Sequence, residues 1–232
     1  MFKHKKHLFF DLDHTLWDFD ANAYDCLSEI HESFGLGAND IALEDLYQTF
    51  TRINKELWTK LELNEIEHDA IRKFRFKNSL EALGLVAGTK MSEAMNRAFL
   101  DLLPTKKKLI DGCMEVLETL KPKYQLHILS NGFHKIQKKK LANSGIQSYF
   151  TKVITNDIAD SRKPDAGIFE FALKKTHARS EDSLMIGDSH LADIMGAKNM
   201  GWDTVHFDQK DNPEELLSTI KITKLSQLLQ YF

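Results

Sequence analysis

Residues 9–16 read Phe-Phe-Asp-Leu-Asp-His-Thr-Leu, and this stretch decides the fold. The apolar run from Leu8 to Leu12 is short and ends in turn residues, which is the pattern of a buried strand. Side chains two residues apart lie on the same side of an extended chain, so Asp11 and Asp13 are expected to share one pocket. Two aspartates at a strand end also form turns, helix caps or loose cation sites, so the pair needs support from elsewhere in the chain.

Four further apolar runs of similar length follow in the second half of the chain. They span residues 126–129, 153–155, 183–186 and 204–207. Helical patterns accompany them at residues 112–120, 135–144, 165–175 and 191–200. Alternating strands and helices are typical of a parallel sheet covered by helices on both faces. The predicted fold class is α/β, with a Rossmann-like, doubly wound parallel sheet as the core.

A long insertion separates the first apolar run from the second. More than about a hundred residues lie between them, which is too many for one crossover. Helical periods occupy this segment at residues 24–34, 43–61, 65–83 and 92–103. We predict an all-helical cap domain at residues 17–104, inserted into a catalytic core made of residues 1–16 and 105–232. Short hinges near Trp17 and Pro104 would join the two domains.

Charge and composition exclude several classes of partner. The chain has 232 residues, with 31 basic against 34 acidic side chains and a net charge of −3. Such a balance gives no global attraction to nucleic acid or to an anionic membrane. The lysine runs at residues 106–108 and 138–140 are predicted to be solvated faces. We therefore expect no nucleic-acid and no membrane partner, and a monomer or small homo-oligomer.

The sequence predicts a cytoplasmic protein. No stretch reaches the roughly 20 apolar residues of a spanning helix, and the apolar run behind the basic N-terminus is too short for a signal peptide. The only two cysteines, Cys26 and Cys113, cannot build a disulfide framework. They are interpreted as small buried hydrophobic residues.

Two motifs in the second half of the chain offer groups that bind phosphate. Residues 128–132 read Ile-Leu-Ser-Asn-Gly, so a strand delivers the Ser130 hydroxyl, the Asn131 amide and the open backbone of Gly132. Residues 161–165 place Lys163 before a proline. Each motif also has a simple reading, the first as a strand-to-helix turn and the second as a surface lysine.

A third motif supplies carboxylates. Residues 185–193 read Met-Ile-Gly-Asp-Ser-His-Leu-Ala-Asp, in which Asp188 and Asp193 form an acidic group that suits Mg²⁺. The alternative is helix capping by Asp188 or Ser189. Every one of these motifs follows the carboxyl end of a separate predicted strand, where open parallel sheets bind ligands. The shared location favours one active site over independent turns.

Taken together, the motifs resemble the haloacid dehalogenase superfamily. The resemblance rests on Asp11-Leu12-Asp13-His14-Thr15, Ser130, Lys163-Pro164, and Gly187-Asp188 with Asp193, and it covers essentially the whole chain. Residues 131–133, Asn-Gly-Phe, are similar to the capped branch that contains pyrimidine 5'-nucleotidases. The resemblance implies a phosphatase whose helical insertion is a cap. His14 stands where the commonest family pattern has glycine.

The residues suggest a mechanism for phosphate ester hydrolysis. Asp11 attacks phosphorus, and Asp13, kept protonated, gives its proton to the leaving alcohol and later takes one from water. Lys163, with Ser130 and Asn131, holds the phosphate oxygens. The substrate is predicted to be a small soluble phosphate ester, a nucleoside 5'-monophosphate in the first instance.

Mg²⁺ is the predicted cofactor, because a carboxylate that attacks a dianion needs its charge neutralised. Asp11 and Asp188 would supply carboxylate ligands. The resemblance implies the backbone carbonyl of Asp13 as a further ligand. Asp193 is expected to orient Lys163 or a metal-bound water, and Thr15 and Ser189 are expected to support the site.

Other activities of the same superfamily stay open. A 2-haloacid dehalogenase needs no acid at position 13, a sugar-phosphate phosphatase or mutase would use the same core, and a phosphonatase would need a cap lysine. The candidate lysines are Lys55, Lys60, Lys73 and Lys77. A phospho-accepting signalling module is a further alternative, which Asp13 and the large cap disfavour. Trp17, Phe19 and Trp58 could stack on a base, but aromatic residues in helical patterns usually belong to the core.

Overall fold

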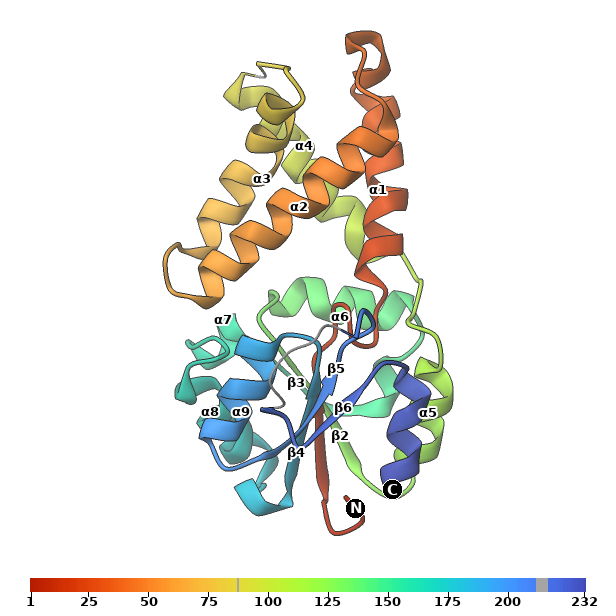
Figure 1. Cartoon of the computed structure of the whole chain (residues 1–232), viewed down its shortest axis with the longest axis vertical. Helices are drawn as coiled ribbons and strands as arrows, with labels where there is room; N and C mark the ends of the chain where they lie inside the picture. The colour runs from red at the N-terminus through yellow and green to blue at the C-terminus, as the bar shows by residue number, and fades with distance from the viewer. Residues whose placement is uncertain (87, 212–216) are drawn as a thin grey trace. The chain divides into compact units, whose positions relative to one another are not determined.

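The computed structural model describes residues 1–86, 88–211 and 217–232. The chain divides into two compact units. The core unit comprises Met1–Phe19 and Lys107–Phe232, and the helical unit comprises Asp20–Lys106. Figure 1 shows a sheet with surrounding helices in the first unit and helices alone in the second.

A parallel sheet forms the centre of the core unit. Its strands within the described residues are β1 (His7–Phe10), β2 (Gln125–Ser130), β3 (Phe150–Thr155), β4 (Ser183–Gly187), β5 (Asp203–Phe207) and β6 (Ile220–Ile222). All five pairings are parallel, and the strand order is β3-β2-β1-β4-β5-β6. This order runs outward from β1 in both directions, which is the arrangement of a doubly wound sheet. The predicted fold class is confirmed.

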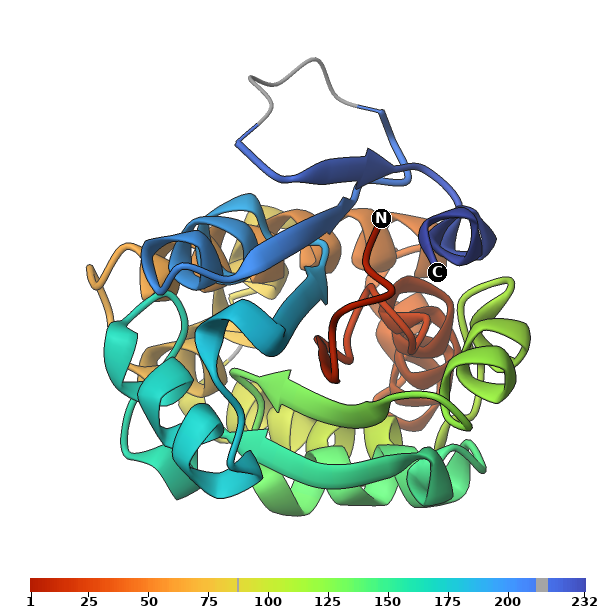
Figure 2. The ribbon, with the colours of Figure 1, turned by 90° about the horizontal axis from the view of Figure 1, so that it is seen from below.

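Helices cover both faces of the sheet. They are α5 (Cys113–Leu120), α6 (His134–Asn143), α7 (Asn156–Ala159), α8 (Ala166–Thr176), α9 (Gly196–Asn199) and a C-terminal 3-10 helix, Leu225–Tyr231. Figure 2 shows α8 and α9 on one side of the sheet, and α5 with the C-terminal helix on the other. On the α8 side, Phe9 and Met185 of the central strands pack with Phe169, Ala197 and Trp202 in one buried cluster.

The burial of each strand explains whether it could be predicted from the sequence. Every residue of β1 and β4 is buried, so these strands read as continuous apolar runs instead of alternating ones. Strand β6 was not predicted, because it is three residues long, lies at the sheet edge and has Lys221 at its centre. The helix predicted at residues 191–200 is a π-helical turn, His190–Met195, followed by the short α9.

The helical unit is built around aromatic side chains. Its helices are α1 (Phe19–Ser33), α2 (Leu43–Glu62), α3 (His68–Ala82) and α4 (Thr89–Leu102), with the first residue of α1 counted in the core unit. The rings of Phe50, Phe76 and Phe99 lie 5.0 to 5.7 Å apart. The buried Arg75 guanidinium lies over the Phe99 ring at 4.5 Å and donates to Asn96. Gly35 follows α1 with a left-handed φ of +62°, the usual conformation after a helix end.

No helix among the described residues is long and apolar enough to cross a membrane.

Two buried histidines connect β1 and β2. The Nδ1 atom of His7 lies 3.1 Å from Nε2 of His127, and the two rings are stacked. Burial, together with the charge of the neighbouring His7, lowers the pKa of His127 from the ordinary 6.5 to about 3. Burial also lowers the pKa of His7. The folded core therefore holds His127 in its neutral form.

Replacing His127 with leucine should reduce the acid sensitivity of the fold. Below pH 6.5 the unfolded chain binds a proton at this histidine and the folded chain does not, so stability falls as the pH falls toward 3. The loss from this group amounts to about 2 kcal/mol at pH 5. Urea unfolding at pH 7 and pH 5 should show a smaller loss in His127→Leu than in the wild type. His4→Gln, at an exposed position, is the control, and equal losses in all three proteins would contradict the assignment.

Candidate active site

Lys163 occupies the centre of a cluster of carboxylates at the carboxyl edge of the sheet. Its side chain is 2% exposed, and its Nζ atom lies 2.7 Å from Oδ1 of Asp11 and 2.6 Å from Oδ1 of Asp193. The third donor of the ammonium goes to the backbone oxygen of Leu129 at 2.8 Å. Burial alone would lower the pKa of Lys163, but the charges of Asp11 and Asp193 raise it above its ordinary value. The lysine is therefore a fixed cation.

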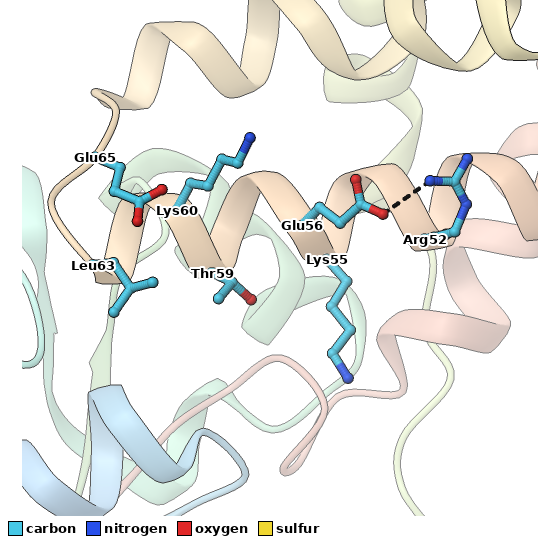
Figure 3. A pocket seen from close by; sticks show the side chains of 7 residues that line it. All are labelled: Arg52, Lys55, Glu56, Thr59, Lys60, Leu63 and Glu65. Atoms are coloured by element: carbon cyan, nitrogen blue, oxygen red, sulfur yellow. Dashed lines mark hydrogen bonds and ion pairs between the residues drawn. The ribbon is translucent and has the colours of Figure 1, made fainter.

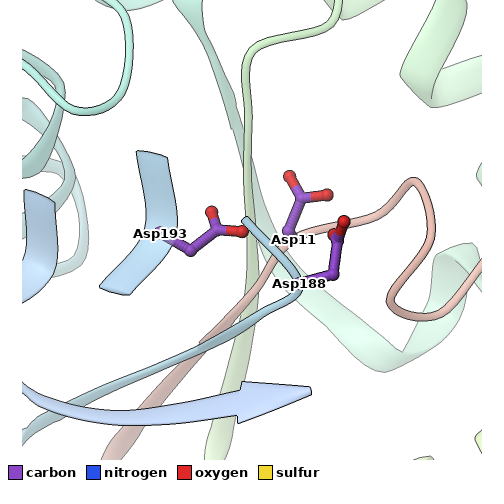
Figure 4. A group of neighbouring side chains, drawn as sticks. All are labelled: Asp11, Asp188 and Asp193. Atoms are coloured by element: carbon purple, nitrogen blue, oxygen red, sulfur yellow. The ribbon is translucent and has the colours of Figure 1, made fainter. Parts of the chain in front are cut away.

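Three carboxylates gather beside this lysine. Oxygens of Asp11, Asp188 and Asp193 all lie within 4.8 Å of one another, and Figure 4 shows the three side chains grouped together. Burial raises the pKa of Asp11 to about 7, because the effects of burial and of the charges of Asp193 and Asp13 outweigh that of Lys163. Burial, and then the charges of Asp11 and Asp193, also raise the pKa of Asp188 well above its usual range.

The donor set of this cluster fits a hard divalent cation. All three groups offer carboxylate oxygens, which are the ligands that Mg²⁺ prefers. Burial and, after it, the charges of neighbouring carboxylates raise the pKa values of Asp11 and Asp188, although Lys163 lowers both. A bound divalent cation would relieve this repulsion.

Asn131 holds the loop that carries Lys163. Its Nδ2 donates to the backbone oxygen of Lys163 at 2.8 Å, and its Oδ1 accepts from the Lys163 backbone N–H at 2.8 Å. Both polar atoms of the carboxamide are thus engaged. The predicted phosphate contact of the Asn131 side chain stays a prediction, and the observed bonds give this residue a role in placing Lys163.

Ser130 and Gly132 form a tight turn after β2. The Ser130 hydroxyl oxygen accepts from the Gly132 N–H at 3.1 Å and from Gln137 Nε2 at 2.8 Å. A hydroxyl that accepts two bonds still has one O–H to donate, which suits it to a phosphate oxygen. A Cβ at position 132 would lie 2.5 Å from Nε2 of Gln137, so any larger residue here would require the Gln137 side chain to move.

Asp13 is ion-paired, which the sequence did not predict. Lys140 Nζ donates to its Oδ1 at 2.6 Å, and Gln137 Nε2 donates to its Oδ2 at 2.8 Å. Burial would raise the pKa of Asp13, but the charge and hydrogen bond of Lys140, helped by Gln137 and His14, lower it overall. The expectation that Asp13 is kept protonated is therefore wrong for this structure. So is the assignment of Lys140 to a solvated face, because this lysine is 3% exposed.

The segment between Asp13 and α1 turns sharply. His14 has a left-handed φ of +60°, a conformation that glycine adopts most easily. Its ring lies 4.8 Å from that of Phe19. Trp17 is fully buried and is therefore a core residue, and Asp18 N donates to the backbone oxygen of Lys108 at 3.1 Å. The outgoing and returning segments of the core unit are thus hydrogen-bonded to each other.

Thr15 and Ser189 donate hydrogen bonds to carboxylates of the acidic cluster. Thr15 Oγ1 donates to Oδ1 of Asp188 at 3.0 Å. The backbone N–H of Ser189 donates to Oδ2 of Asp193 at 3.0 Å, and its hydroxyl accepts from Ala192 N at 3.0 Å as the cap of the π-helical turn. This capping was one of the alternatives for the motif. The cap and the acidic cluster occur together, because the Ser189 hydroxyl caps the turn and the carboxylates of Asp188 and Asp193 belong to the cluster.

The helical unit carries a separate pocket on α2 that contains none of the core residues described above. Figure 3 shows its lining, which consists of Arg52, Lys55, Glu56, Thr59, Lys60, Leu63 and Glu65. Arg52 is paired with Glu56 at 2.9 Å. Two of the four candidate lysines for a phosphonatase, Lys55 and Lys60, lie here, whereas Lys77 pairs with Glu81 at 3.8 Å. Trp58 packs against a small apolar cluster of the same unit.

Comparison with known proteins gives consistent matches. Residues 8–207 match the family of haloacid dehalogenase-like hydrolases. The chain is 34% identical to the pyrimidine 5'-nucleotidase PynA of Streptococcus pneumoniae, over 91% of this chain and 85% of that protein. It is 26% identical to the pyrimidine 5'-nucleotidase YjjG of Escherichia coli, over 96% of each chain.

A third relative has a solved structure. The HAD-hydrolase YfnB of Bacillus subtilis is 30% identical over 97% of this chain and 94% of that protein. Its crystal structure, described as bound to magnesium and as revealing interdomain movement, superposes with a TM-score of 0.87 over 98% of both chains at 27% identity.

Substituting Gly187 with alanine should disturb the acidic cluster and lower the free energy of unfolding of the protein. The new Cβ would lie 2.2 Å from Oδ2 of Asp193, which Lys163 and Ser189 hold in place. Relief of this overlap must displace Asp193 from Lys163, and such crowding costs about 1–3 kcal/mol. Urea unfolding measures the effect. Gly88→Ala is the matched control, since its Cβ would meet nothing within 4 Å; equal stability of Gly187→Ala and the wild type would contradict the geometry.

Proposed function

The chain belongs to the family of haloacid dehalogenase-like hydrolases, and from this premise we propose that it is a Mg²⁺-dependent phosphomonoester hydrolase. Its substrate is a small soluble phosphate ester, with nucleoside 5'-monophosphates as the first candidates. The observation that carries the proposal is the contact of Lys163 with Asp11 and Asp193 beside Asp188. A buried cation next to crowded carboxylates suits the binding of a dianion through a divalent metal.

The first chemical step in the proposed reaction takes place on Asp11. One carboxylate oxygen forms a bond to phosphorus while the bond from phosphorus to the ester oxygen breaks, giving an aspartyl-phosphate. Asp13 gives a proton to the departing oxygen. It must therefore carry the proton that it takes from water in the second step of the preceding turnover, which requires that its pair with Lys140 loosens as the substrate enters. Lys163 and Ser130 hold the other phosphate oxygens. When bound at Asp11 and Asp188, with the backbone carbonyl of Asp13, Mg²⁺ supplies charge neutralisation.

The second step regenerates the enzyme. A water molecule attacks phosphorus and loses a proton to Asp13, and the bond between phosphorus and the Asp11 oxygen breaks. Inorganic phosphate leaves. Asp193 has no direct part in these two reaction steps, because its bond to Lys163 gives it the task of orienting that lysine.

We further propose that the helical unit is the cap domain and selects the alcohol part of the substrate. The proposed phosphate-binding residues come from the core unit and recognise only the phosphate, so specificity requires other groups. The names of PynA and YjjG, both pyrimidine 5'-nucleotidases, support a pyrimidine nucleotide as substrate.

A panel of phosphate esters tests the activity and its metal requirement together. With Mg²⁺, pyrimidine monophosphates should release inorganic phosphate faster than purine monophosphates, sugar phosphates or phosphonoacetaldehyde, and EDTA should abolish release until Mg²⁺ is restored. An isomerised sugar phosphate would indicate a mutase. Chloride release from a 2-chloroacid would indicate a dehalogenase, and substrate-dependent inactivation by borohydride would indicate a phosphonatase. Any of these three results without phosphate ester hydrolysis would refute the proposal.

Replacing Asp11 with asparagine should abolish turnover, since a carboxamide is not the required nucleophile. Acid-quenched mass spectrometry should find a phosphorylated Asp11 peptide in the wild type and none in Asp11→Asn. Exposed Asp69→Asn in the helical unit serves as the control and should retain activity. A phosphoenzyme in Asp11→Asn would rule out this nucleophile, and a lasting wild-type phosphoenzyme without turnover would favour a signalling module.

A further inference from the structure

One face of α6 reaches the carboxylate of Asp13. Gln137 and Lys140 are three residues apart on this helix, so their side chains lie on the same side. Gln137 Nε2 donates to Oδ2 of Asp13 at 2.8 Å, and Lys140 Nζ donates to Oδ1 at 2.6 Å. Each oxygen of the carboxylate therefore has its own donor from α6.

Lys140 is itself held in place by aromatic rings. Its Nζ atom lies 4.4 Å from the centre of the Trp17 ring and 5.7 Å from that of Phe19. An ammonium that is almost fully buried needs compensation for its lost hydration, and here one carboxylate and two aromatic faces provide it. The position of Lys140 is thus fixed on both sides.

Gln137 is also constrained. Its side chain is fully buried, and the same Nε2 atom that donates to Asp13 donates to the hydroxyl oxygen of Ser130 at 2.8 Å. Gly132 leaves the space that this amide fills. Gln137 therefore sets the position of Asp13 relative to the serine proposed to hold the phosphate.

We propose that Lys140 and Gln137 are positioning residues that hold Asp13 as the proton acceptor for hydrolysis of the aspartyl-phosphate. This inference rests on the proposed function. A carboxylate whose two oxygens each accept one fixed hydrogen bond keeps a further lone pair on each oxygen for the attacking water. In this step the water proton goes to Asp13, the water oxygen bonds to phosphorus, and the bond from phosphorus to Asp11 breaks.

The two half-reactions can be separated in steady-state kinetics. The parameter kcat/KM reports the steps up to release of the alcohol, whereas kcat includes hydrolysis of the aspartyl-phosphate. A defect confined to hydrolysis lowers kcat and KM together and leaves kcat/KM nearly unchanged. It also makes kcat independent of the leaving group, because the same intermediate forms from every ester.

Lys140→Met is the main variant, since methionine keeps an apolar chain against Trp17 and removes the charge. With p-nitrophenyl phosphate and Mg²⁺, kcat should fall about 100-fold, the loss that follows a misplacement of about 1 Å. KM should fall in proportion, and rapid mixing should show a burst of nitrophenol equal to the enzyme concentration. Lys140→Arg should restore part of kcat. Gln137→Met should show the same kcat defect if Lys140→Met fails to fold.

Lys139→Met is the matched control, because Lys139 lies next to Lys140 on the same helix and is exposed. It should behave as the wild type. Equal falls of kcat and kcat/KM in folded Lys140→Met, without a burst, would overturn the inference, and so would unchanged kinetics. Both outcomes leave the proposed function intact. Absence of turnover in the wild type and in Lys139→Met would instead refute the proposed function, and the inference with it.

Discussion

The bonds of the buried Lys163 ammonium are the interaction on which the site depends. Burying an ammonium group costs much free energy of hydration unless each of its N–H donors has an acceptor in the protein. Lys163 finds three, on Asp11 after β1, on Asp193 after β4 and on the backbone oxygen of Leu129 in β2. These three strands are neighbours in the sheet. One side chain thus ties together the carboxyl ends of the central strands.

A second lysine gives the two aspartates of the first motif different environments. Asp11 lies among carboxylates, and its pKa is raised to about 7 mainly by burial. Asp13 is also buried, but the pair with Lys140 holds its pKa below the ordinary value. Two carboxylates separated by one residue can therefore perform different tasks, because neighbouring charges decide which proton state each prefers. A cation that neutralises the acidic cluster would bring Asp11 toward the ionised form that a nucleophile needs.

The sequence predicted the fold and the placement of the strand-end residues for one physical reason. Parallel strands buried on both faces must be apolar throughout, and their carboxyl ends meet at one edge, so motifs that follow such runs fall close together. Asp11 and Lys163 are 152 residues apart and in contact. Lys140 escaped prediction because a lysine run on a helix resembles a solvated face, and its partner Asp13 is 127 residues away. The short edge strand β6 and the π-helical turn before α9 carry no periodic signal of their own.

The separation of chemistry from substrate choice follows from where these residues lie. The side chains of the carboxylate cluster, together with Lys163, Ser130 and Asp13, all belong to the core unit. In the proposed reaction each of them meets phosphate, metal or water, and none of these groups differs from one phosphate ester to another. Discrimination between esters must therefore come from contacts with the alcohol, which a long insertion after the first strand can change without disturbing the ends of the sheet. Under the proposed function, the core keeps one reaction while the inserted helices determine which molecule undergoes it.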